Sequence, residues 1–194
     1  MASAEPGSKV TVTNPTDAEL VESCLAGRRE SFDVLVERHQ RHVYQLCYRF
    51  VGNHEDASDL AQDVFIRAYR GLKNFRGQAS LGTWLYRIGV NVCLNKVGAK
   101  TPQPHALDPL LAASDERIVS QAESAADAVL RGERAGQVRA AIARLPRKQR
   151  ATLILRVYHE LPHEQIAGIL GSSVGAVKAN FFHALNNLKK LMAE

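Results

Sequence analysis

Four residues that suit contacts with nucleic acid recur at helical spacing in the middle of this 194-residue chain: Trp84, Arg87, Asn91 and Asn95. Steps of three and four residues place such side chains on one stripe of an α-helix. An indole ring stacks on bases, a guanidinium group pairs with phosphate, and carboxamides read base edges. The pattern indicates a helix face that binds nucleic acid; a solvated face with one half-buried tryptophan is the alternative.

The loop before this helix places an aromatic ring between a carboxamide and a cation: Asn74, Phe75 and Arg76. Proteins that bind single strands stack unpaired bases on rings of this kind. The neighbouring stripe of the helix is apolar and is expected to face a core: Leu81, Leu85, Ile88 and Val92. The loop and the helix are therefore expected to offer one surface to an unstacked base.

The helix expected at residues 53–70 carries two stripes about 90° apart. The core stripe is Ala57, Leu60, Ala61, Val64 and Ala68. The other stripe combines carboxylates with one large apolar residue: Asp56, Asp59, Gln62, Asp63 and Ile66. An isoleucine among acidic residues suits docking against a basic, partly apolar partner helix, and a solvated acidic face is the alternative.

The C-terminal third predicts a helix-turn-helix, because six small or apolar residues let two short helices cross at a tight turn: Ile166, Ala167, Leu170, Gly171, Val174 and Val177. In the last helix, the expected buried stripe is Val174, Val177, Phe181, Leu185 and Leu188. The residues expected to point outward are small or can form hydrogen bonds: Ala176, Ala179, Asn180, His183 and Asn186. Lys178 and Phe182 lie on the flanks of this face. Such a face suits a major groove, and a plain three-helix packing unit is the alternative.

Helix signals divide the chain into an all-α fold of two helical domains joined by a flexible linker. Thr16 and Glu19 form a capping box, and Asn53 is placed to cap a later helix. The expected layout is a disordered tail (1–15), a four-helix domain (16–97), a linker (98–129) and a helix-turn-helix domain (130–194). Residues 99–130 carry a net charge of −3 and residues 131–194 carry +7, so the last domain suits a polyanionic partner.

Composition argues against several other classes of protein. No apolar run is long enough to span a bilayer, and the polar start has no hydrophobic segment of a secretory signal. Three cysteines, far apart, fit a reducing compartment rather than a disulfide framework. Two sets of residues resemble metal ligands. His39, His42 and Cys47 lie on one helix, but His39 and Cys47 are on its core stripe. His159 and His163 are four residues apart, but Pro162 interrupts that pair. We expect no catalytic residue, no cofactor and no bound metal.

Several runs resemble bacterial sigma factors. DLAQDVFIRAY (59–69), FRG (75–77) and TWLYRI (83–88) look like region 2, while LPRKQR (145–150) and EQIAGILGSSVGAVK (164–178) look like region 4. Both occur in this order with a linker too short for region 3, which resembles the extracytoplasmic-function (ECF) class. The resemblance implies a factor that binds core RNA polymerase, directs it to specific promoters and assists melting of the −10 element.

The resemblance also implies roles for individual residues. The acidic stripe Asp56, Asp59, Gln62, Asp63 and Ile66 would dock on the β′ clamp helices of the polymerase. The −10 element would be met by Asn74, Phe75, Arg76, Trp84, Arg87, Asn91 and Asn95. The −35 element would be met by Arg156, Ser172, Ser173, Lys178, Ala179, Asn180, Phe182 and His183. The other implied partners are the polymerase β subunit and an anti-sigma factor, which would hold this bacterial cytoplasmic protein at the inner membrane; no small-molecule substrate is implied.

The chain departs from the family pattern in its last domain. The family often has Ser or Thr at Pro162, Thr at Ala176, and Arg at Asn180 and His183. The recognition helix is therefore less cationic than usual, and DNA affinity is expected to depend on Arg147, Lys148, Arg150 and Arg156. The alternative function is a stand-alone helix-turn-helix transcriptional regulator, which would bind duplex DNA without polymerase.

Overall fold

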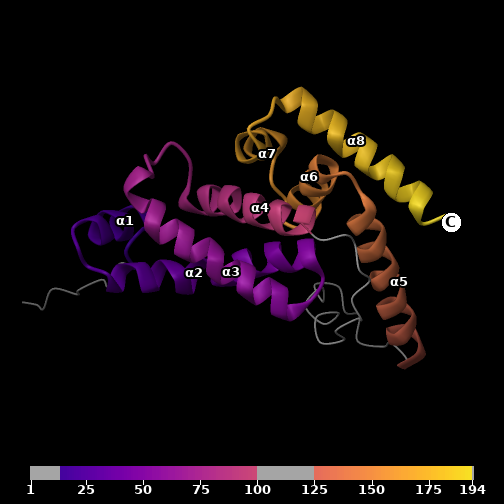
Figure 1. Cartoon of the computed structure of the whole chain (residues 1–194), viewed down its shortest axis with the longest axis horizontal. Helices are drawn as coiled ribbons and strands as arrows, with labels where there is room; N and C mark the ends of the chain where they lie inside the picture. Colours follow the sequence, from indigo (N-terminus) through magenta and orange to yellow (C-terminus); the bar gives the residue numbers. More distant parts are fainter. Residues whose placement is uncertain (1–13, 100–124, 194) are drawn as a thin grey trace, which may run out of the picture.

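The computed structural model of the chain describes residues 14–99 and 125–193, and every regular element within these ranges is a helix. In chain order the elements are α1 (Asp17–Leu25), α2 (Glu30–Val51), α3 (His54–Gly71), the short 3-10 helix η1 (Leu72–Asn74), α4 (Leu81–Ala99), α5 (Ala125–Arg144), α6 (Arg147–Val157), α7 (His163–Leu170) and α8 (Val174–Leu191). Figure 1 shows two groups, α1 to α4 and α5 to α8. The prediction of an all-α fold with two helical domains is confirmed.

The predicted tail and linker fall mainly on residues 1–13 and 100–124, which lie outside the described residues. Helix α4 runs to Ala99 and α5 begins at Ala125, so both helices extend into the range 98–129 that was assigned to the linker.

Two helices of the first domain begin at the caps that the sequence indicates. The Thr16 hydroxyl accepts the backbone N–H of Glu19 at 3.3 Å, and the Glu19 carboxylate accepts the backbone N–H of Thr16 at 2.7 Å. Asn53 Oδ1 accepts the backbone N–H of Asp56 at 2.8 Å. These bonds satisfy N–H groups that the first turns of α1 and α3 would otherwise leave without a partner.

Helices α2, α3 and α4 pack against one another and form the core of the first domain. Gly89 of α4 faces Leu46 of α2 so closely that a Cβ atom at residue 89 would lie 2.8 Å from Leu46 Cδ2. The missing side chain lets the two helices approach. The predicted core residues Leu81, Leu85 and Val92 of α4 are buried, but Ile88 is only half-buried.

Helices α6, α7 and α8 form the predicted helix-turn-helix domain, with α5 packed on α8. Gly171 ends α7 with φ of 58°, the left-handed conformation that the tight turn requires, and the Ser173 hydroxyl caps α8 by accepting the N–H of Ala176 at 3.2 Å. The expectation for Leu185 was wrong, since its side chain is 44% exposed while Ala184 is buried. The contact stripe of α8 therefore passes through Ala184 and not through Leu185.

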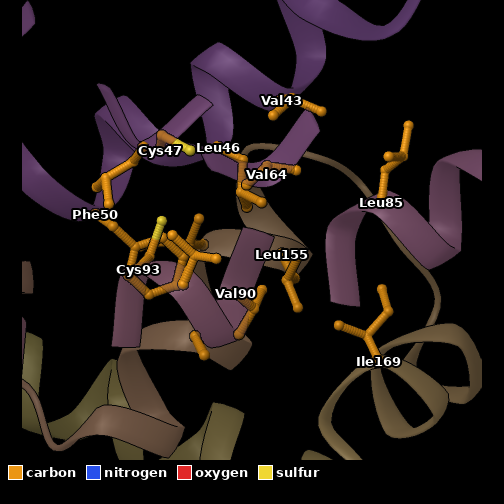
Figure 2. Close-up of a cluster of buried hydrophobic side chains, with 14 of the residues drawn as sticks. Val43, Leu46, Cys47, Phe50, Val64, Leu85, Val90, Cys93, Leu155 and Ile169 are labelled. Atoms are coloured by element: carbon orange, nitrogen blue, oxygen red, sulfur yellow. The ribbon is translucent and has the colours of Figure 1, made fainter. Parts of the chain in front are cut away.

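The two domains also pack against each other. Helix α7 lies on α4, and α5 and α6 contact α2 (Figure 1). Leu155 and Ile169 of the second domain belong to the same buried cluster as Leu85 and Val90 of α4, which Figure 2 shows. This second contact explains why Val90, which lies outside the predicted core stripe, is only 1% exposed.

Alanine substitution of two nearby glycines, Gly168 and Gly171, should have opposite effects on stability. Gly171→Ala should lower the free energy of unfolding by about 1 kcal/mol, because alanine is strained in the left-handed region. Gly168→Ala, in the interior of α7 with open space around it, should raise it by about 0.5–1 kcal/mol through helix propensity. Urea denaturation followed by circular dichroism measures both. Equal effects would contradict the strained turn.

Candidate nucleic-acid and protein interfaces

Helix α4 turns its predicted nucleic-acid face toward solvent. Arg87, Asn91 and Asn95 are exposed, and Trp84 is half-buried. The indole lies over the backbone of Gly71 at the end of α3, where a Cβ atom would be 3.5 Å from Trp84 Cζ2. The stripe is therefore a free face anchored at one end by a ring that the domain holds in place.

The loop before α4 is tied to that ring. Phe75 packs on Trp84 with 5.2 Å between ring centroids and 48° between ring planes. Asn74 ends η1 and is exposed, as is Arg76. The structure thus brings the loop and the helix stripe together, as expected. The half-buried Phe75 extends the surface of Trp84 and does not project alone into solvent.

The acidic stripe of α3 separates into two kinds of residue. Asp59, Gln62 and Ile66 are exposed, and Ile66 retains 48% of its accessible surface. Asp63 forms an ion pair with Arg67 one turn later, at 2.9 Å. Only Asp59, Gln62 and Ile66 of this stripe therefore face outward without a charged partner that the structure records.

Asp56 has a structural role within the first domain. Its carboxylate lies 3.0 Å from Lys96 Nζ on α4 and accepts a bond from the Asn53 amide at 3.1 Å. Its side chain is only 18% exposed. Asp56 thus joins the start of α3 to the last turns of α4, which the helical pattern of α3 alone does not reveal.

The α3 face continues beyond the predicted residues. Tyr69, one turn after Ile66, is 46% exposed, and its ring meets Phe32 of α2 edge-on at 5.0 Å. Beside the stripe, a groove of about 450 Å³ runs between α2 and α3 and has mostly apolar walls, with Tyr44, Phe65 and Gln62 among its lining residues. The predicted stripe ended at Ile66 and did not include Tyr69, although the spacing of three between Ile66 and Tyr69 was a usable signal.

In the second domain, α8 presents a mixed outward face. Lys178, Ala179, Phe182 and His183 are exposed, and Asn180 is half-buried. Phe182 is 62% exposed, and its ring meets that of His183 edge-on with 5.8 Å between the ring centroids. Ser173 is engaged as the cap of α8, and Ser172 is half-buried in the turn. Arg156 donates to the carbonyl of Leu161 at 3.0 Å, which holds the loop ahead of α7.

Arg150 does not contribute to this outward face. Its side chain is 6% exposed and donates to the carbonyl oxygen of Phe50 at the end of α2. Burial lowers the pKa of this guanidinium. Lys148 is exposed, whereas the guanidinium of Arg147 occupies the space that a side chain on Gly98 of α4 would fill. Arg150 is therefore not accessible to DNA in this arrangement of the domains, and the expectation that it adds to DNA affinity stays a prediction.

Two of the histidines form hydrogen bonds within the fold. His39 pairs with Asp17 at 2.7 Å, and Tyr86 OH lies 3.0 Å from His159 Nδ1. Among the described residues, no group of three or more His, Cys, Asp or Glu side chains is placed to hold a metal ion. The described helices also include none that is long and apolar enough to cross a membrane.

Comparison with known proteins gives one consistent result. The family model of Sigma-70 region 2 matches residues 35–101, and that of Sigma-70, region 4, matches residues 135–188. The RNA polymerase sigma-H factor of Pseudomonas aeruginosa is 35% identical, over 93% of this chain and 96% of its own. The ECF RNA polymerase sigma-E factor of Escherichia coli is also 35% identical, over 87% of this chain and 90% of its own.

Solved structures share the fold. CnrH in complex with the cytosolic domain of CnrY has a TM-score of 0.63 at 24% identity, covering 90% of this chain and 95% of that one. The sigma factor RpoE of Bartonella quintana, in complex with the anti-sigma factor NepR, has a TM-score of 0.62 at 18% identity, covering 84% and 98%.

Two aspartates on α3 should respond differently to substitution. Asp56→Ala should lower the free energy of unfolding by about 1 kcal/mol, because it removes the pair with Lys96 and a carboxylate from the first turn of α3. Asp59→Ala, at an exposed position, should change it by less than about 0.5 kcal/mol. Thermal and urea denaturation measure both values. A larger loss for Asp59→Ala would refute the division of the stripe.

Proposed function

The chain belongs to the ECF class of RNA polymerase sigma factors, and we propose that its two domains share promoter recognition between an exposed face of α4 and an exposed face of α8. The observation that carries the proposal is the free polar stripe of α4, whose neighbouring stripes are buried. As a sigma factor it binds core RNA polymerase and directs it to promoters. We propose that the catalytic step of transcription belongs entirely to the core enzyme.

The outward face of α3 is the proposed docking surface for the β′ clamp helices. Asp59 and Gln62 offer polar acceptors, and Ile66 and Tyr69 add exposed apolar area in the same row. A face that combines negative charge with large apolar side chains suits a basic, partly apolar helix. Asp56 and Asp63 lie beside this row: Asp56 joins α3 to α4 through Lys96, and Asp63 pairs with Arg67 within α3 itself.

The α4 face and its loop are proposed to capture an unstacked base of the −10 element. Opening a duplex costs stacking energy, which a pocket for an extruded base can offset. Trp84 and Phe75 provide ring surface, while Asn91 and Asn95 provide donors and acceptors for base edges. Asn74, Arg76 and Arg87 surround these groups and complete the proposed surface.

The α8 face is proposed to meet the −35 element. Lys178 offers a phosphate contact. Beside it, Ala179, the half-buried Asn180 and His183 have side chains small or polar enough to approach base edges, and the exposed ring of Phe182 offers an apolar contact. Ser172 and Ser173 lie at the N-terminus of α8, where backbone N–H groups favour an anionic phosphate. Arg156 donates one N–H to the carbonyl of Leu161 and keeps its charge and its other donors for a phosphate.

Regulation by an anti-sigma factor is also proposed, since the sigma factor RpoE of Bartonella quintana, which shares this fold, has been solved in complex with one. The proposed location is the bacterial cytoplasm, with retention at the inner membrane while that partner is bound. A stand-alone helix-turn-helix regulator is not favoured, because the first domain matches region 2.

Transcription in a purified system tests the proposal. The chain should direct specific initiation only when core polymerase is present. Specific binding to duplex DNA by the chain alone, together with no effect on the start sites used by polymerase, would instead support the regulator.

Substitution on α3 should weaken polymerase binding. Ile66→Asp places a charge at the centre of the proposed interface and should reduce affinity for core polymerase about 30-fold, or roughly 2 kcal/mol. Leu25→Asp is the matched control, because Leu25 is 53% exposed on α1 and lies outside the proposed surface. Fluorescence anisotropy of labelled protein measures both affinities. Equal losses would place the interface elsewhere.

The two DNA faces should fail in different ways. Asn91→Ala should reduce discrimination between −10 sequences by about 1–3 kcal/mol. Lys178→Ala should weaken binding to all promoter sequences about equally. It should also reduce the slope of log K against log[salt] by about one, and Lys190→Ala is the matched control. Promoter selection and salt titration with reconstituted polymerase measure these changes. If neither variant differed from the wild type, both assignments would be lost.

A further inference from the structure

A buried cation joins the two domains without an acidic partner among the described residues. The guanidinium of Arg150, on α6, donates to the carbonyl of Phe50 and, at 3.4 Å, to that of Ala143. Its Nε is buried and has no hydrogen-bond partner. Phe50 is the penultimate residue of α2, so its carbonyl is one of those that the helix leaves unpaired at its negative end. Arg150 therefore caps a helix of the other domain.

A second arginine of α6 occupies a similar place. The guanidinium of Arg147 fills the space next to Gly98, the penultimate residue of α4. The first turn of α6 thus directs one cation to the end of α2 and another to the end of α4. Cations near helix C-termini are stabilised by the helix dipole, and each of these contacts crosses the domain boundary.

Two further contacts cross the same domain boundary, and each involves an aromatic ring. Arg49 of α2 lies 3.9 Å from the ring centroid of Tyr158, and Tyr86 of α4 forms its 3.0 Å hydrogen bond with His159. His159 Nε2 is buried without a hydrogen-bond partner. A recess of about 160 Å³ lined by His39, His42 and Tyr86 lies beside this pair.

The packing of the two domains places the proposed DNA-binding faces of α4 and α8 too close together to contact the −10 and −35 elements of one promoter at the same time. Helices in contact lie 8–10 Å apart, so α8, which packs on α7 over α4, is within about 20 Å of α4, and its own length is about 27 Å. Elements centred at −10 and −35 are roughly 25 base pairs apart, or about 85 Å. Simultaneous contact therefore requires the domains to separate.

We propose that Arg150, together with Tyr86 and His159, forms an intramolecular latch that holds the free protein in a closed state unable to span a promoter. Opening exposes Arg150 on the domain that meets upstream DNA, so the cation that holds the latch becomes available to phosphate. The consequence for promoters rests on the proposed function; the latch itself is a property of the free chain.

The latch should weaken in acid. Burial first, and then the nearby charges of His42 and Arg49 on α2, lower the pKa of His159 to about 4, whereas an exposed histidine titrates near 6.5. Tyr86, which faces it from α4, has its own pKa raised by burial and stays neutral. The closed state therefore has its full stability above about pH 6.5 and loses it as pH falls toward 4. Between about pH 7.5 and 5.5, the ratio of closed to open protein should fall about tenfold.

The test uses the full chain without polymerase. Small-angle scattering measures the radius of gyration, and NMR titration measures the pKa of His159. Arg150→Met keeps an apolar stem but loses the cap, so it should expand the protein and move the His159 pKa toward 6.5. Lys148→Met is the matched control, since it removes an exposed cation two residues away and should leave both values unchanged.

Further variants keep the test decisive if Arg150→Met loses its helical circular dichroism. Tyr86→Phe removes one hydroxyl and should lower the closed-to-open ratio about fivefold. His159→Phe should remove the expansion between about pH 7.5 and 5.5. A normal His159 pKa in the wild type, or variants that scatter like the wild type, would overturn the latch. Failure to bind polymerase by a chain that still closes would remove the proposed function and leave the latch intact.

Discussion

Helix α4 has three sides, and each is committed to a different environment. One side packs on α2 and α3, where Gly89 permits close approach to Leu46; a second packs on the helix-turn-helix domain through Val90 and Tyr86. The third side keeps Arg87 and Asn91 in solvent. Because two sides are buried, the helix cannot rotate to bury its polar stripe. The exposed stripe is thus held in place by packing on the other two.

The boundary between the domains combines a buried apolar cluster with a buried guanidinium that has no acidic partner among the described residues. A buried guanidinium loses hydration, and here it regains hydrogen bonds from backbone carbonyls, with one Nε left without a partner. Such a contact gives less net stability than its geometry suggests, because the same groups form hydrogen bonds with water when the domains are apart. That balance suits an association that is specific in its geometry and still reversible.

Features set by local sequence were predicted well, and features set by tertiary contact were not. The capping box at Thr16, the cap at Asn53 and the left-handed turn at Gly171 depend on residues within one or two turns, so the sequence indicated them directly. The burial of Val90 depends on contact with the second domain. In the sequence, Arg150 is only one of several cations in a basic run, although its side chain is buried in the structure. No pattern in a single helix can show which cation will face a distant carbonyl, and the residue-level binding roles remain proposals.

The position of Trp84 has a practical consequence. It is the only tryptophan in the chain, and it lies half-buried beneath Phe75 at the edge of the polar stripe of α4. Indole emission responds to nearby rings and to solvent, so the protein carries an intrinsic fluorophore at the surface where we propose that a base stacks. Binding of an oligonucleotide there can be followed by quenching in the unmodified protein, without a dye or an engineered label.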